Sequence, residues 1–117
     1  MHRSLIRVKR AYDDPSPRDG QRVLVERLWP RGLTKARAAI DFWHKEVAPS
    51  AELRRWFGHD AAKWPEFRRR YLKELRHNPQ AVDLLRRKAK RGPLTLVYAA
   101  RDDEHNSAVV LNDYLES

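Results

Sequence analysis

The segment PLTLVYAA, residues 93–100, is the most informative stretch for fold class. It is an apolar run in which Thr95 is the only polar residue between Pro93 and Ala100. Such a run is typical of a strand buried on both faces, as at the centre of a parallel sheet. Helices packed around a small central sheet are the economical way to cover such a strand. The segment therefore predicts an α/β fold.

Two other segments show strand character. Residues 5–9, LIRVK, alternate apolar and basic side chains, and residues 22–29, RVLVERLW, form a second run that Pro30 must end. In this second run the alternation places one set of side chains on a common face: Val23, Val25, Arg27 and Trp29. Residues 41–47, DFWHKEV, fit a short strand or extended segment better than a helical continuation, although their pattern is ambiguous.

Helix starts are marked by capping residues and stops by glycine. Thr34 can cap a short helix that runs to about Ile40, and Gly58 suits the end of a helix that Ser50 begins. Aromatic and leucine side chains at helical spacing predict a buried face on a third helix. The remaining expected signals are Asp60 before that third helix, Asn78 with Pro79 before a fourth, Gly92 after it, and Asn106 or Ser107 before a last one.

The order of these elements predicts an α/β single domain spanning residues 1–117. Its sheet is expected to be small, mixed or mostly parallel, with about three to four strands and about five surrounding helices. An α+β arrangement, with the first two strands paired as an antiparallel hairpin, is the alternative. The long connection between those strands favours the mixed sheet.

Composition excludes several classes of protein. The chain of 117 residues is 41% apolar and 35% charged and contains no cysteine. Disulfides, thiolate catalysis and cysteine-ligated zinc are therefore excluded. No run has the length of a signal peptide or of a membrane span, so a cytoplasmic protein without a membrane partner is expected.

Positive charge is concentrated in one stretch. Residues 63–91 contain eleven Lys or Arg against three Asp or Glu, within a chain whose net charge is +9. A basic surface of this kind attracts polyanions. One hypothesis is therefore a nucleic-acid-binding module with four candidate residues, Arg68, Arg69, Arg87 and Lys88. A solvated helix face is the alternative explanation of the same charge.

A second, favoured hypothesis follows from where polar segments meet the strands. Ligands of open α/β sheets bind beyond the carboxyl ends of the strands. RLWPRG, residues 27–32, ends one strand, and ARDDEHN, residues 100–106, follows another just before a helix start. Guanidinium groups and a helix N-terminus both favour phosphate or carboxylate. The sequence thus predicts a pocket for a small anionic ligand, with ligand-binding candidates Arg27, Trp29, Arg31, Arg101, His105 and Asn106.

Catalysis is the less specific part of this hypothesis. His59 or Asp41 is the candidate proton-transfer group, because a histidine with a nearby carboxylate can act as a general base. A structural alternative pairs Arg27 with Asp41 and places Trp29 in the core. Histidines with Asp41, Asp60 or Asp102 could together form a metal site, but no metal-binding spacing is present. Dinucleotide, P-loop and hydrolase motifs are absent, and the sequence leaves the cofactor unknown. A third hypothesis is an assembly role through an exposed aromatic anchor.

Four blocks of sequence together resemble the bacterial YeaO-like family, a domain of unknown function, over nearly the whole chain. The blocks occur in order: KRAYDDPSPRDGQRVLVERLWPRGL (9–33), IDFWHKEVAPSAELRRWFGHD (40–60), KWPEFRRRYLKEL (63–75) and LTLVYAARDDEHNSAVVL (94–111). The resemblance implies no established reaction. Some longer relatives carry cysteines where this chain has EHN, so any thiol chemistry of those relatives does not transfer.

The resemblance also implies site positions that overlap the predicted pocket. It adds Lys45 to the ligand-binding candidates and supports His59 and Asp41. Some members carry a transcription-regulator label, but this sequence shows no recognition-helix pair that would support it. The positions that match the family blocks are Asp19, Gly20, Arg27, Trp29, Pro30, Arg31, Gly32, Asp41, Lys45, Ser50, His59, Arg101, His105 and Asn106.

Overall fold

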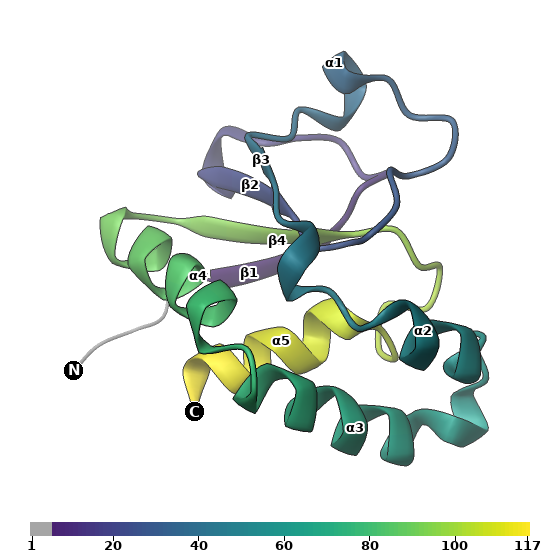
Figure 1. Ribbon diagram of the computed structural model, residues 1–117. Helices are drawn as coiled ribbons and strands as arrows, with labels where there is room; N and C mark the ends of the chain where they lie inside the picture. The colour runs from purple at the N-terminus through teal and green to yellow at the C-terminus, as the bar shows by residue number, and fades with distance from the viewer. Residues whose placement is uncertain (1–5) are drawn as a thin grey trace.

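A computed structural model describes residues 6–117 and contains a four-stranded sheet with the order β1-β4-β2-β3 (Figure 1). All three strand pairings are parallel. The strands are β1 Ile6–Arg10, β2 Gln21–Leu24, β3 Phe42–Trp43 and β4 Leu94–Tyr98. The predicted α/β class is confirmed; Leu5, included in the first predicted strand, lies outside the described residues.

The position of β4 explains its apolar sequence. It pairs with β1 on one side and with β2 on the other, so that Leu96 lies between Val8 and Val23. All five of its residues are buried, as predicted for a central parallel strand. Because β4 separates β1 from β2, the antiparallel hairpin considered as an alternative is wrong. All four strands point the same way, so their carboxyl ends meet at one edge.

Five α-helices accompany the sheet in the described part of the chain. Their bounds are α1 Lys35–Ala38, α2 Ala51–Phe57, α3 Trp64–Arg76, α4 Pro79–Arg91 and α5 Ser107–Glu116. Short 3-10 helices occupy 17–19, 45–47 and 61–63. Figure 1 shows α3 and α5 side by side, with α1 at the opposite end of the molecule. Among residues 6–117, no helix has both the length and the apolar character that crossing a membrane requires.

The caps predicted at Thr34, Ser50 and Asn106 are confirmed by their hydrogen bonds. Asp60 instead caps the 3-10 helix that precedes α3, and Asn78 begins α4 without a side-chain capping bond. The Thr34 hydroxyl accepts from the amide of Arg37, and the Ser50 hydroxyl accepts from the amide of Leu53. Gly58 ends α2 in a left-handed conformation with φ of 54°. Asn106, rather than Ser107, caps α5 by accepting from the amide of Val109. These signals are local, which is why the sequence alone predicts them.

The prediction for residues 22–29 is wrong beyond the middle of that segment. The strand ends at Leu24, and Val25 adds one further backbone hydrogen bond to Val97. Val23 and Val25 enter the large core that includes Phe67, Tyr71 and Leu111. Trp29 instead joins a second apolar cluster around Leu24 and Val97, with its ring 5.5 Å from that of Trp43. The chain leaves the sheet before the alternation in its sequence stops.

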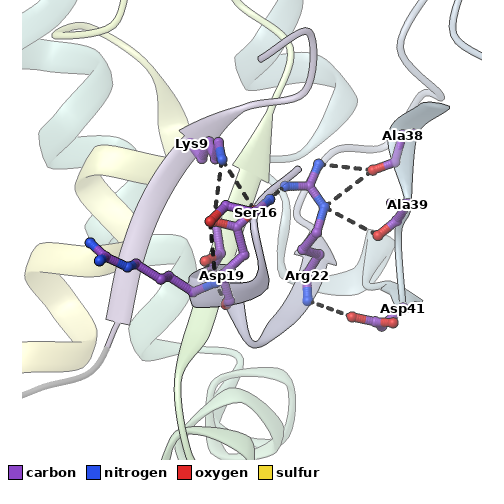
Figure 2. A network of polar contacts seen from close by, with 9 residues as sticks. Lys9, Ser16, Asp19, Arg22, Ala38, Ala39 and Asp41 are labelled. Atoms are coloured by element: carbon purple, nitrogen blue, oxygen red, sulfur yellow. Dashed lines mark hydrogen bonds and ion pairs between the residues drawn. The ribbon is translucent and has the colours of Figure 1, made fainter. Parts of the chain in front are cut away.

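A buried ion-pair network lies at the start of β2. The Asp19 carboxylate accepts from Arg22 Nη1 at 2.7 Å, from Lys9 Nζ at 3.2 Å and from the Ser16 amide at 3.0 Å (Figure 2). Burial alone would raise the pKa of Asp19, but these hydrogen bonds together lower it. The network fastens the 3-10 helix at 17–19 to β1 and β2.

Arg22 connects this network to the end of α1. Its guanidinium donates to the carbonyl oxygens of Ala38 and Ala39, at the end of α1 (Figure 2). The amide of Arg22 donates to the Asp41 carboxylate at 2.8 Å. Asp41 therefore holds the start of β3 beside β2, away from the carboxyl ends of the strands.

Candidate functional site

A small cavity of about 60 Å³ lies where β2 and β4 end and α5 begins. We call it the strand-end cavity. The two segments predicted to meet at this edge both contribute to it, through Arg27 on one side and Ala100, His105 and Asn106 on the other. Its full lining is Glu26, Arg27, Ala48, Pro49, Arg54, Phe57, His59, Phe67, Ala100, His105, Asn106 and Ser107.

Two arginines supply positive charge to this cavity. Arg27 is fixed by hydrogen bonds from Nε to the Pro49 carbonyl at 2.8 Å and from Nη2 to the Ala48 carbonyl at 3.5 Å. Arg54 is half-buried, and within residues 6–117 its guanidinium makes no hydrogen bond or close ion pair. Arg27 bonds to backbone carbonyls and not to Asp41, so that part of the structural alternative is wrong. Its other part, Trp29 in the core, agrees with the packing of Trp29 against the second apolar cluster.

The position of Arg54 follows from the anchoring of α2. The amide and hydroxyl of Ser50 donate to the Glu74 carboxylate at 2.8 and 2.7 Å, which ties the start of α2 to α3. Arg54 lies three residues before Phe57, so both project from the same face of the helix. Phe57 enters the core and also lines the cavity. That spacing was the signal by which the sequence could have indicated Arg54.

A carboxylate, Glu26, shares the cavity with these arginines. Its Oε2 accepts from the Ala99 amide at 2.9 Å. Burial raises the pKa of Glu26, and the Ala99 hydrogen bond with the charges of Arg54 and His59 only partly counters that effect. Sequence patterns did not single out Glu26, although it directly precedes Arg27.

His105 is oriented by a neighbouring carboxylate. Its Nδ1 lies 2.9 Å from Oδ2 of Asp102, and its ring meets Trp64 edge-on at 5.2 Å. Hydrogen bonds from the Glu104 amide and from His105 lower the pKa of Asp102. The Asp102 carboxylate therefore fixes the orientation of the His105 ring.

His59 reaches the cavity through a strained backbone. Its φ is 58°, directly after Gly58 at 54°. For a residue with a side chain, this left-handed conformation costs about 1–2 kcal/mol. Strain of this kind is concentrated at functional sites, where the surrounding structure holds it in place. The proton-transfer role of His59 stays a prediction.

The N-terminus of α5 adds a partial positive charge beside these side chains. Asn106 is buried, and its Nδ2 donates to the Asp102 carbonyl at 3.0 Å. Ser107, the first residue of the helix, lines the cavity. Aligned peptide dipoles favour an anion at this position. Over the described residues, no three His, Asp or Glu side chains are grouped so that they could hold a metal ion.

The other predicted ligand-binding residues lie elsewhere. Trp29 donates from Nε1 to the Leu33 carbonyl at 2.7 Å, and exposed Arg31 accepts from the Tyr12 hydroxyl through its carbonyl oxygen. Lys45 places Nζ 4.0 Å from the centroid of the Trp43 ring. Arg101 lines a separate hollow beside β1 with Lys9 and Arg10. The structure does not bring these four residues, or Asp41, into the strand-end cavity.

Three of the four candidate nucleic-acid residues have partners within the chain. Arg68 lies 3.5 Å from Asp113, and Arg69 bonds twice to Glu66. Lys88 donates to the side chain of Gln21 and lies over the ring of Phe42. Arg87 is exposed. The nucleic-acid interface stays a prediction.

Comparison with known proteins agrees with the resemblance found in the sequence. The uncharacterized protein YeaO of Escherichia coli K12 is 46% identical over 112 residues, covering 96% of this chain and 97% of that protein. The uncharacterized protein Rv3073c of Mycobacterium tuberculosis H37Rv is 44% identical over 110 residues, covering 94% and 92%. No solved structure matches the chain. A family model described as the inactive DUF488-N3 subclade matches residues 5–117. The chain therefore belongs to this YeaO-like family, DUF488-N3i.

Proposed function

We propose that the protein binds a small oxyanion, of the phosphate or carboxylate class, in the strand-end cavity. The observation that carries this proposal is Arg54, a half-buried residue of the cavity lining whose guanidinium makes no hydrogen bond within the described chain. A guanidinium offers only N–H donors, so one that is unbonded within the chain is open to an anionic partner from outside it. An anion in the cavity would supply that partner.

Three further features support an anionic ligand. Arg27 is held beside the cavity by the Pro49 carbonyl, so little side-chain freedom is lost when it binds. The positive end of the α5 dipole lies at the same place. A cavity needs a volume of about 10–15 Å³ to hold one water molecule. The strand-end cavity, at about 60 Å³, therefore suits a group of a few heavy atoms.

The family description favours binding over a reaction. The matching family is described as inactive, and the chain contains no cysteine that could act as a nucleophile. Neither fact conflicts with an arginine-lined anion site. We therefore assign the cavity a binding role, with His105 and Asn106 helping to position the ligand.

Arg54→Ala should weaken the binding of inorganic phosphate by about 10- to 100-fold. A hydrogen bond to a charged group contributes about 1.5–3 kcal/mol, and each 1.4 kcal/mol is about tenfold in affinity. Arg55→Ala is the matched control, because Arg55 is the next residue of α2 and is exposed. Isothermal titration calorimetry measures both. Equal affinities of the two variants, or no phosphate binding by the unaltered protein, would contradict the proposal.

A further inference from the structure

A carboxylate is an unusual neighbour for an oxyanion, and Glu26 lines the same cavity as Arg27 and Arg54. Oε2 of Glu26 accepts from the Ala99 amide. Elsewhere in residues 6–117, the carboxylate finds no second hydrogen-bond donor. The cavity thus offers an acceptor as well as cationic donors.

An ionised carboxylate only accepts hydrogen bonds. It repels an oxyanion whose oxygens all lack protons, and it attracts one that keeps a hydroxyl. At neutral pH, sulfate has no proton, whereas hydrogen phosphate retains at least one. The two ions are otherwise similar in size and tetrahedral shape, so a carboxylate in the site distinguishes them by a repulsive and an attractive contact together.

We propose that Glu26 makes the strand-end cavity selective for a protonated oxyanion, so that hydrogen phosphate binds in preference to sulfate. In this arrangement the P–OH group donates to the Glu26 carboxylate, while Arg54 and Arg27 donate to the charged oxygens. The inference rests on the proposed function, because it specifies which anions the same cavity accepts.

The surroundings of Glu26 suit this role. The hydrogen bond from the Ala99 amide at the end of β4 restricts the carboxylate to one position. The Glu26 backbone is held as well, because its carbonyl accepts from Trp43 Nε1 at 2.6 Å. Burial raises the pKa of the carboxyl group, which makes the carboxylate a better acceptor. Preorganised acceptors discriminate more sharply than mobile ones.

Calorimetric titration with sodium phosphate and sodium sulfate at neutral pH and constant ionic strength tests the inference. The unaltered protein should bind phosphate at least about tenfold more tightly than sulfate. Glu26→Gln keeps the shape but supplies an amide donor, so sulfate binding should strengthen and the preference should fall below about threefold. Glu52→Gln removes an exposed carboxylate of α2 that does not line the cavity and should leave the preference unchanged.

Arsenate provides a second measurement that needs no variant. It keeps a proton at neutral pH, as phosphate does, so the unaltered protein should bind it nearly as tightly as phosphate. Equal binding of phosphate and sulfate, arsenate binding as weakly as sulfate, or an unchanged preference in Glu26→Gln would overturn the inference while leaving anion binding intact. If none of the three ions binds, the proposed function fails and the inference fails with it.

Discussion

Asp19→Ala is expected to lower the free energy of unfolding by about 3–5 kcal/mol, the range for breaking one side of a buried ion pair. The Arg22 side chain is only 4% exposed, and its Nη1 lies 2.7 Å from the Asp19 carboxylate. Removing that carboxylate leaves a buried guanidinium without its counter-charge and deprives Lys9 of its partner. Urea unfolding followed by circular dichroism measures the loss.

The stability loss caused by Asp19→Ala should be smaller in acid than at neutral pH. The folded state lowers the pKa of Asp19 below its ordinary value of 3.8. Its stabilising contribution is therefore fully present above about pH 3.8 and is lost as the pH falls through the lower folded-state pKa. The difference in unfolding free energy between Asp19→Ala and the unaltered protein should therefore shrink as the pH falls through the folded-state pKa of Asp19.

Arg18→Ala is the matched control for this prediction, since Arg18 adjoins Asp19 but is exposed. Its effect should stay within about 0.5 kcal/mol. A loss of less than about 1 kcal/mol for Asp19→Ala would show that the network does not stabilise the fold as described.

Gly20→Ala is expected to destabilise the protein by about 3 kcal/mol or more, from backbone strain and overlap together. Gly20 has φ of 62° and ψ of −133°, a region that is nearly restricted to glycine. A Cβ at this position would overlap the carbonyl oxygen of Pro93. That oxygen cannot move away easily, because it accepts from the amide of Gln21 at the start of β2.

Gly32→Ala separates the cost of backbone strain from the cost of atomic overlap. Gly32 also has a positive φ, 80°, but a Cβ there would meet no atom within 4 Å. Its substitution should cost about 1 kcal/mol, from backbone conformation alone. Thermal and urea unfolding of the two variants provide the comparison. Equal losses would refute the close approach of Gly20 to Pro93.

The sequence predicted the fold well where the signal is local or continuous. The apolar run of β4 indicated a central parallel strand, and the hydroxyl and amide side chains of Thr34, Ser50 and Asn106 marked helix starts that the structure confirms. The strand prediction failed for residues 25–29, although Val25 still faces the same core as Val23. A pattern of side chains cannot show where a strand loses its hydrogen-bonding partner and turns towards the other face.

The candidate site was only partly predictable, for a related reason. Arg27, His59, His105 and Asn106 reach the cavity from segments that the strand-end argument or the resemblance had indicated. Arg31 and Arg101 follow the same strands yet turn elsewhere. Glu26 and Arg54 went unnoticed because their positions depend on contacts distant in sequence: the Ala99 amide for Glu26, and the anchoring of Ser50 to Glu74 for α2.

A phosphate titration followed by two-dimensional NMR of backbone amides tests the central claim most directly. If the strand-end cavity binds the anion, saturable shift changes should concentrate in residues 26–27, 54–59 and 99–107. Those segments contain most of the cavity lining. Changes confined to the basic stretch 63–91, or changes that grow linearly without saturation, would contradict a specific anion site at this edge of the sheet.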